Sequence, residues 1–368
     1  MRGLKMQNSS IKADGINSRI VKKPSPREFI KKCVGFIKKH LASWKIDLMH
    51  KCGFDCIFCT TDEGPSMQFQ KLSDQKLVNE QIGDKYTPTS PAVTIEYSQL
   101  MSTLKKELDS KPKSFGKGHT LMYSQLTDAF SPRLVELGHT KKALDMIFEK
   151  TSFRVRILTK NAIVGDDDWI DYFGQHRDRV IVGLSTGSLD DGWAKKIEMG
   201  TSPPSHRFIA IKRLQDAGIP TYGMLCPIFP KLVQDGRVAE LIDKINPDMM
   251  ETIWAEPYNA HPKINWMKMR YALRSDPTEY DWFTQAYEEG NKDLLSEYHT
   301  DLYGQLLDHS IENDWSHKLK YLLYESEINK ADVIKFKGLV GVLLQNKPDE
   351  GSGCSKNMAL AELQKEVE

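Results

Sequence analysis

The sequence predicts an α/β fold: a TIM-like partial (β/α)6 barrel with a C-terminal helical layer. Apolar runs alternate with helix-like segments from residue 44 to about residue 260. Such alternation requires parallel strands joined by right-handed crossovers. The run at residues 179–186 is almost wholly apolar, as a parallel strand buried on both faces should be. The chain of 368 residues is long enough for one large α/β domain with an appendage.

Six strands account for the barrel, and each except the last is followed by a helix. We expect the strands at residues 44–49, 119–124, 154–160, 179–186, 221–228 and 249–255. The helices between them are expected at residues 94–108, 140–150, 167–173, 204–217 and 233–245. Gly218 stands where a helix commonly ends. In barrels of this kind the chemistry gathers at the carboxyl ends of the strands.

The flanking segments differ in composition from the barrel at residues 44–265. Residues 1–43 are basic, and we expect a flexible tail followed by a helix at residues 26–41, with Cys33 on its apolar face. Residues 60–93 form a long polar connection, typical of a functional loop or a small insertion. Residues 266–346 are helix-like and rich in aromatic residues, which predicts a helical layer packed on the barrel. Residues 347–368 are expected to be disordered.

Three cysteines on one short loop carry the strongest chemical signal. Cys52, Cys56 and Cys59 occur in the run CGFDCIFC, directly after the first predicted strand. Three soft thiolates suit an iron–sulfur cluster or a zinc ion. A closed structural zinc site needs four ligands, and no second cysteine pair exists in the sequence. Three ligands leave one metal position open for chemistry. The alternatives are a zinc knuckle and a reduced, buried cysteine cluster.

The remaining composition bounds the cellular setting. Cys33, Cys226 and Cys354 have no regular spacing, so no disulfide framework is expected and the compartment should be reducing. No leading signal or membrane-spanning run is recognisable, which predicts a soluble, cytoplasmic protein without a membrane partner. Residues 1–51 are strongly basic, and such a segment binds nucleic acid or is simply solvated.

The cysteine run resembles the CxxxCxΦC signature of the radical S-adenosylmethionine superfamily, with Phe58 as the aromatic Φ. The resemblance implies that the three cysteines hold three irons of a 4Fe–4S cluster and that S-adenosylmethionine chelates the fourth. One electron, supplied by a partner such as flavodoxin or ferredoxin, would then cleave the sulfonium to a 5′-deoxyadenosyl radical. That radical abstracts hydrogen from a substrate. Members of the superfamily characteristically have a partial (β/α)6 barrel.

A narrower resemblance covers residues 44–260. Residues 158–160 (LTK), 182–185 (VGLS), 197–203 (IEMGTSP) and 217–230 look like spore photoproduct lyase and the DNA repair photolyase group. The resemblance implies that Phe58, Thr127, Asp128, Lys160 and Ser185 line the cofactor site. A lysine that ends an apolar strand is costly to bury unless its ammonium meets an anion. The alternative for Lys160 is an ordinary solvated side chain.

Two positions depart from the lyase pattern. Ser124 or Gln125 stands where the lyase has its hydrogen-donating cysteine, and Phe58 and Thr60 stand where it has tyrosines. Cys226, at the end of the fifth predicted strand, is the candidate replacement donor.

Tyr258 and Tyr123 are further candidate donors. Core packing is the alternative for Cys226. Glu256 is a substrate-facing carboxylate, a proton shuttle or a strand cap.

Three functional hypotheses follow. The first is a radical S-adenosylmethionine enzyme that acts on a nucleic acid or a nucleotide. The second keeps the radical chemistry but directs it to a small molecule or a peptide. The third is a non-catalytic protein that binds zinc or senses redox state through its cysteine cluster. Bound iron and sulfide separate the first two from the third, and the salt dependence of substrate binding separates the first from the second.

Overall fold

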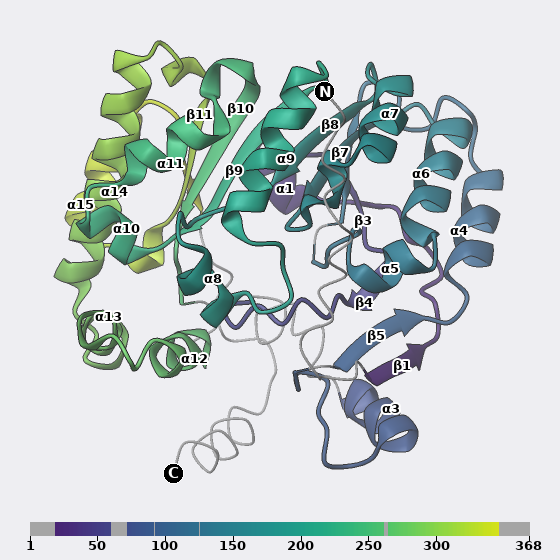
Figure 1. The fold of residues 1–368 in the computed structure, drawn as a ribbon, viewed down its shortest axis with the longest axis horizontal. Coiled ribbons are helices and arrows are strands. Elements are labelled where there is room, and N and C mark those ends of the chain that lie inside the picture. Colours follow the sequence, from purple (N-terminus) through teal and green to yellow (C-terminus); the bar gives the residue numbers. More distant parts are fainter. Residues whose placement is uncertain (1–18, 60–71, 92, 125, 261–263, 346–368) are drawn as a thin grey trace.

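The computed structural model describes residues 19–345 apart from residues 60–71, 92, 125 and 261–263 (Figure 1). Residues 1–18 and 347–368 lie outside the described residues, as do Thr60, Gln125 and Cys354. The flexible tail predicted for residues 1–25 is wrong at its end, because Arg19–Lys23 form a strand, β1, paired with β5 (Val93–Tyr97).

A nine-stranded sheet forms the centre of the fold, in the order β12-β11-β10-β9-β8-β7-β6-β3-β2. All neighbouring pairs from β3 to β12 are parallel, and β2 (Lys31–Lys32) joins β3 antiparallel at the edge. The six predicted strands are confirmed as β3 (Trp44–Ile46), β6 (Thr120–Tyr123), β7 (Arg154–Thr159), β8 (Val180–Leu184), β9 (Thr221–Ile228) and β10 (Met250–Pro257).

The C-terminal region corrects the prediction of a purely helical layer. β11 (Leu319–Tyr324) and β12 (Val342–Gln345) continue the sheet beyond β10, so it has eight parallel strands rather than six. Within the described residues the edge strands β2 and β12 do not pair with each other, and the sheet is open. The run at residues 319–324 is short and apolar, and periodicity alone cannot distinguish such a strand from a buried helical segment.

Helices follow one another around the outside of the sheet (Figure 1). The predicted helices appear as α4 (Leu100–Asp109), α6 (His139–Lys150), α7 (Asp167–Gln175), α9 (Pro204–Asp216), α10 (Pro230–Gln234) and α11 (Val238–Ile245). Shorter helices are α5 (Pro132–Glu136) and α8 (Asp191–Ile197). The C-terminal helices are α12 (Ile264–Ala272), α13 (Pro277–Phe283), α14 (Lys292–Glu312) and α15 (Lys330–Phe336). α14 packs against α10 and α11.

A second, small sheet lies beside the large one, in the order β1-β5-β4, and it corrects two predicted elements. Its strands are β1 (Arg19–Lys23), β5 (Val93–Tyr97) and β4 (Met49–Lys51), and α3 (Leu72–Ile82) packs on them. The predicted strand at 44–49 therefore ends at Ile46, and Met49 belongs to the small sheet. The predicted helix at 94–108 begins as strand β5 and becomes helical only at Leu100. The alternating buried Val93 and Ile95 fit a strand.

The N-terminal segment also differs from its prediction. The expected helix at residues 26–41 is reduced to α1 (Val34–Lys38), none of whose residues is buried. The segment after α1 packs on one face of the sheet through Leu41 and Ala42, in a cluster with Met122, Ile181, Tyr222, Met224, Trp254 and Leu322. Neighbouring residues of the same strands belong to the larger core. Because side chains alternate between the two faces of a strand, this cluster lies on the opposite face from that core.

Candidate functional site

The cysteine loop begins directly after β4 and gathers its three thiols near one another. The pKa of Cys52 is raised to about 12, mainly by burial and also by the neighbouring Cys59, although hydrogen bonds from the backbone of Phe54 and Asp128 oppose the increase. Burial also raises the pKa of Cys56 well above its ordinary value; Lys160 opposes this effect, and Cys52 and Cys59 add to it. Each thiol therefore lies within electrostatic range of the others. All three are free of disulfides.

The described part of the chain contains no ready-made cage of three or more His, Cys, Asp or Glu side chains around a metal position. The donor chemistry of the loop nevertheless fits a cluster of soft metal ions, because three thiols are the ligands that iron–sulfur clusters and zinc prefer. The loop thus supplies the right donor atoms close together, without fixing them in a closed coordination sphere.

The loop is fixed to the segment that follows α8. Cys56 forms an antiparallel bridge with Glu198. The amide of Ile57 donates to the carbonyl of Ile197 at 3.0 Å, and the amide of Gly200 donates to the carbonyl of Phe54 at 3.1 Å. A Cβ atom at Gly200 would lie 2.9 Å from that Phe54 oxygen, so only glycine allows this approach. The run at residues 197–203, noted above only for a resemblance, therefore positions the cysteine loop.

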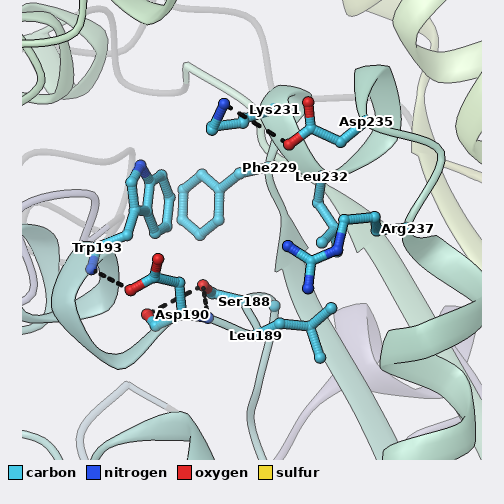
Figure 2. A pocket seen from close by; sticks show the side chains of 10 residues that line it. Ser188, Leu189, Asp190, Trp193, Phe229, Lys231, Leu232, Asp235 and Arg237 are labelled. Carbon is cyan, nitrogen blue, oxygen red and sulfur yellow. Dashed lines mark hydrogen bonds and ion pairs between the residues drawn. The ribbon is translucent and has the colours of Figure 1, made fainter.

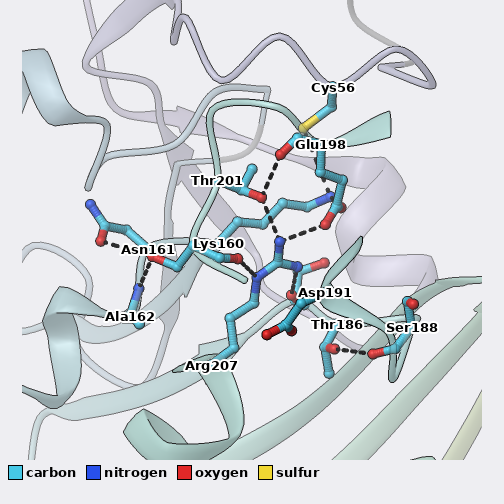
Figure 3. Close-up of polar contacts among 12 residues, drawn as sticks. Cys56, Lys160, Asn161, Ala162, Thr186, Ser188, Asp191, Glu198, Thr201 and Arg207 are labelled. Carbon is cyan, nitrogen blue, oxygen red and sulfur yellow. Dashed lines mark hydrogen bonds and ion pairs between the residues drawn. The ribbon is translucent and has the colours of Figure 1, made fainter. Parts of the chain in front are cut away.

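Lys160 follows β7 and directs a buried cation at the loop (Figure 3). Its Nζ lies 4.0 Å from the Cys56 sulfur and 4.4 Å from the centre of the Phe58 ring. The ammonium also pairs with the carboxylate of Glu198. Burial lowers the pKa of Lys160, but Cys56 and Glu198 outweigh burial and raise it above its ordinary value. Lys160 is therefore charged at neutral pH, and Glu198 supplies one anionic partner for its ammonium.

Glu198 is shared by two cations. Its second partner is Arg207 of α9, whose side chain is almost fully buried and also donates to the carbonyls of Ser202 at 2.7 Å and Ser185 at 2.8 Å. Burial raises the pKa of Glu198, but Lys160 and Arg207 together hold it below its ordinary value. Arg207 thus ties α9 and the end of β8 to the same carboxylate that holds Lys160.

Asp128 joins the carboxyl ends of β6 and β7. Its carboxylate accepts from the Thr159 hydroxyl at 2.8 Å, from the Lys160 amide at 2.8 Å and from the Phe130 amide at 2.8 Å. Burial raises the pKa of Asp128, and these hydrogen bonds oppose the increase. Because the Asp128 backbone also touches Cys52, the residue connects the strand ends to the cysteine loop.

Thr127 and Ser185 also make bonds within the strand-end framework. The Thr127 hydroxyl donates to the Met49 carbonyl at 3.4 Å, and the Thr127 amide donates to the Asp47 carboxylate at 3.3 Å. The Ser185 hydroxyl donates to the Cys226 carbonyl at 2.8 Å. The structure brings both residues to the carboxyl edge of the sheets, where their side chains join neighbouring strands.

The two candidate catalytic residues occupy different surroundings. Cys226 of β9 is partly exposed, and its thiol donates to Glu256 at 3.2 Å. Tyr258 is 1% exposed, and its hydroxyl donates to Asn265 at 3.1 Å. Asn265 in turn donates to the carbonyl of Phe58 at 2.7 Å. Tyr258 therefore supports the cysteine loop from within the core.

The other candidate donors are also buried. Tyr123 is fully buried and donates to the carbonyl of Thr140 at 2.7 Å. Ser124 is 2% exposed, and its hydroxyl has no hydrogen-bond partner among the described residues.

A cavity of about 70 Å³ lies next to this region, between α8 and α10 (Figure 2). Trp193, Phe229 and Arg237 are among its lining residues. Ligand pockets usually measure about 300–1,000 Å³, so this cavity is too small for a nucleoside cofactor. Phe229 packs edge-on against Phe58, with ring centres 5.4 Å apart, and contributes to the apolar side of the cysteine loop.

No protein-family model matches the sequence. "Uncharacterized protein ORF301" of Acidianus two-tailed virus is 22% identical over 209 residues, or 56% of this chain; the match spans 63% of that relative's length. No helix within the described residues is long and apolar enough to cross a membrane.

Among solved structures, a spore photoproduct lyase mutant with bound AdoMet and dinucleoside spore photoproduct is 16% identical, with a TM-score of 0.43. The match covers 75% of this chain and 72% of the lyase. A tagged anSMEcpe with bound AdoMet is 14% identical over 67% of this chain and 59% of its own length, with a TM-score of 0.36. At these identities, the likeness to the solved structures concerns the fold alone.

Proposed function

We propose that the chain is a radical S-adenosylmethionine enzyme, with Cys52, Cys56 and Cys59 as ligands of three irons of a 4Fe–4S cluster. The observation that carries the proposal is the convergence of three thiols, none of them in a disulfide, beside a largely buried, charged lysine. When bound, the cluster and S-adenosylmethionine supply one-electron cleavage of the sulfonium and a 5′-deoxyadenosyl radical. An external electron donor such as flavodoxin or ferredoxin belongs to the same proposal.

Lys160 favours the ionised form of the ligand nearest to it. A cysteine must lose its proton before it binds a metal, and a nearby cation stabilises the thiolate. Lys160 lowers the pKa of Cys56 against the effect of burial, and Glu198 keeps the ammonium in place. Phe58, which is 8% exposed, keeps water away from the same side of the loop.

The cofactor contacts proposed for Thr127, Asp128, Lys160 and Ser185 are supported by their common position at the carboxyl ends of neighbouring strands. Lys160 is the residue best suited to meet the cofactor's carboxylate, because it is the cation nearest to Cys56. Asp128 and Ser185 support this role because Asp128 accepts from the Lys160 amide and the Ser185 amide donates to the carbonyl of the preceding residue, Thr159.

Anaerobic reconstitution with iron and sulfide tests the cofactor assignment. We expect about four irons and four sulfides per chain, with cluster absorbance at about 400 nm. Cys56→Ala should lose most of this iron, whereas Cys33→Ala, the matched control outside the loop, should keep it. Adding S-adenosylmethionine and dithionite should yield 5′-deoxyadenosine only with the intact loop. One zinc per chain without this absorbance would support the non-catalytic alternative.

For the substrate we propose a nucleic acid or a nucleotide. The support is the basic segment around α1, where Lys31, Lys32 and Lys38 are exposed. Binding to phosphates should weaken steeply as salt concentration rises, because counterions are released. Fluorescence anisotropy with a single-stranded DNA oligonucleotide at two salt concentrations measures this. Binding that is insensitive to salt would favour a small molecule or a peptide. A cytoplasmic location is also proposed, since none of the five described cysteines forms a disulfide.

A further inference from the structure

A second cluster of reactive and charged side chains lies where β9, β10 and β11 end. Its members are Cys226, Glu256, Tyr324 and Lys39, which come from three strands and from the segment after α1. Glu256 accepts from the Cys226 thiol at 3.2 Å and lies 4.0 Å from the Lys39 ammonium. Lys39 also donates to the Tyr324 hydroxyl at 2.7 Å. The Glu256 carboxylate therefore contacts both the Cys226 thiol and the Lys39 ammonium. The Tyr324 hydroxyl helps to fix the position of that ammonium.

The N-terminal segment holds Lys39 firmly in this cluster. The indole of Trp254 donates to the Lys39 carbonyl at 2.9 Å, and the side chain of Arg156 donates to the Leu41 carbonyl. Leu41 is buried against the sheet. The Lys39 side chain is 17% exposed, and that of Glu256 is 13% exposed. Residues 39–41 thus form one wall of the region in which Cys226 lies.

Cys226 lies beside the end of β8, where the Ser185 hydroxyl donates to its carbonyl at 2.8 Å, and its thiol donates to Glu256. Burial raises the pKa of its thiol well above the ordinary value, and Glu256 raises it further. The two cations that lower it are Lys160 and Lys39, which approach from β7 and from the N-terminal segment. Lys160 is the residue that lies 4.0 Å from the Cys56 sulfur. Cys226 is therefore a neutral thiol within electrostatic range of the cation at the proposed cluster.

We propose that Glu256, fixed by Lys39 and Tyr324, is a positioning residue that orients the Cys226 thiol, and that this thiol gives a hydrogen atom to a carbon radical formed at the carboxyl ends of β8 and β9. The inference rests on the proposed function and deepens it. In the step an S–H bond breaks and a C–H bond forms, the radical passes from carbon to sulfur, and no separate proton or electron is needed. The N-terminal segment, through Lys39, then completes the site.

The positioning role of Glu256 can be tested on protein that contains no iron–sulfur cluster. Alkylation of each cysteine by iodoacetamide, resolved by mass spectrometry across pH, gives the reactivity of Cys226 in the full chain. Glu256→Gln keeps the size and the hydrogen-bond acceptor but removes the negative charge, so the Cys226 pKa should fall. Its alkylation near neutral pH should then rise several-fold. Glu251→Gln, on the same strand but exposed and paired with Arg154, is the control and should match wild type. An unchanged profile in Glu256→Gln would overturn the positioning role.

The donor role is tested with S-adenosylmethionine itself as the probe. In D₂O the thiol carries deuterium, and a 5′-deoxyadenosyl radical formed without substrate can take that atom. We expect monodeuterated 5′-deoxyadenosine from wild type and several-fold less label per molecule formed from Cys226→Ser with the same iron content. Equal label in both proteins overturns the donor role. A wild type that retains iron but forms no 5′-deoxyadenosine overturns the proposed function instead, while the alkylation result still stands on its own.

Discussion

At the scale of single residues, Glu198 determines how the cysteine loop and the sheet fit together. Its backbone pairs with Cys56, and its carboxylate pairs with Lys160 and Arg207. Buried ion pairs add little net stability when complete, because desolvation offsets the attraction between the charges. Removing one partner is much more costly, since the remaining charges stay buried without compensation. Glu198 therefore matters most for the position of Lys160.

We expect Glu198→Gln to lower the free energy of unfolding by about 3–5 kcal/mol, because two buried cations lose their shared anion. Urea unfolding followed by tryptophan fluorescence measures the change. The control is Glu240→Gln, whose partner Arg237 lies 2.8 Å away on the surface; an exposed pair contributes at most about 1 kcal/mol. Equal losses of unfolding free energy in the two variants would show that the ion pairs of Glu198 stabilise the protein no more than an exposed pair does.

At the scale of elements, the end of the sheet depends on a close contact between two backbones. Gly341, which precedes β12, has φ +72°, and a Cβ atom there would lie 2.5 Å from the Leu319 carbonyl oxygen. Its own carbonyl accepts from the Tyr321 amide at 2.8 Å. The parallel pairing of β11 with β12 therefore needs glycine at this position, both for its left-handed backbone and for the space.

Comparing two glycines separates these two requirements. Gly338 has φ +83°, but a Cβ atom there would meet nothing within 4 Å. We expect Gly338→Ala to cost about 1–2 kcal/mol from backbone strain alone, and Gly341→Ala to cost clearly more because it also clashes. Thermal unfolding of both variants measures the difference. If Gly341→Ala lost no more stability than Gly338→Ala, the inference that β12 approaches β11 too closely for a Cβ atom at Gly341 would be wrong.

At the scale of the whole molecule, the two sheets share no strand and are stabilised differently. The small sheet and the helix α3 that packs on it contain two carboxylates with cationic partners, Glu96 in β5 and Asp74 in α3. Asp74 accepts from His50 at 2.9 Å and pairs with Lys23, while Glu96 pairs with Arg133 at 2.9 Å and with Lys22. Burial raises the pKa of both carboxyls, but these bonds outweigh burial, and each pKa lies below its ordinary value. Their stabilisation is therefore complete at neutral pH.

A group with a depressed pKa in the folded state loses its contribution as pH falls through that pKa. We expect Asp74→Asn to lower the opening free energy of β1 and β5 at pH 7 by about 1–3 kcal/mol, and the difference from wild type to shrink below pH about 4. Hydrogen exchange, corrected for intrinsic rates, measures both quantities. The strands β8 and β9 of the large sheet serve as the internal reference. A difference that stayed constant with pH would contradict the role of the ionised Asp74.

The large sheet also depends on contacts between distant parts of the chain. The segment after α1 covers the sheet face opposite the main core, and Trp254 and Arg156 hold it there through backbone carbonyls. Sequence periodicity predicted a longer helix at residues 26–41, because Phe29, Ile30, Cys33, Ile37 and Leu41 are apolar at near-helical spacing. Ile37 is instead exposed, and the other four side chains are buried by separate parts of the fold. Tertiary packing outweighed local helical preference here.

Much of the site could be predicted from local patterns. The three cysteines are identified by their spacing, and the alternation of strands and helices places Lys160, Ser185 and Cys226 at strand ends. Arg207, Lys39 and Tyr324 could not be assigned in this way. They act through ion pairs and hydrogen bonds to residues that are far from them in sequence, such as Lys39 and Tyr324, which are separated by 285 positions. No period or motif records such a pairing.

The sequence by itself determined the order of the first six parallel strands and the presence of three thiols on one short loop, because short-range periodicity and residue spacing are local properties. Only the tertiary structure decided that the sheet continues through β11 and β12, that Glu198 holds Lys160 beside Cys56, and that Lys39 meets Glu256. Those features depend on which buried charges and backbone groups find partners across the chain, and an unpaired charge or amide is too costly to leave inside a protein.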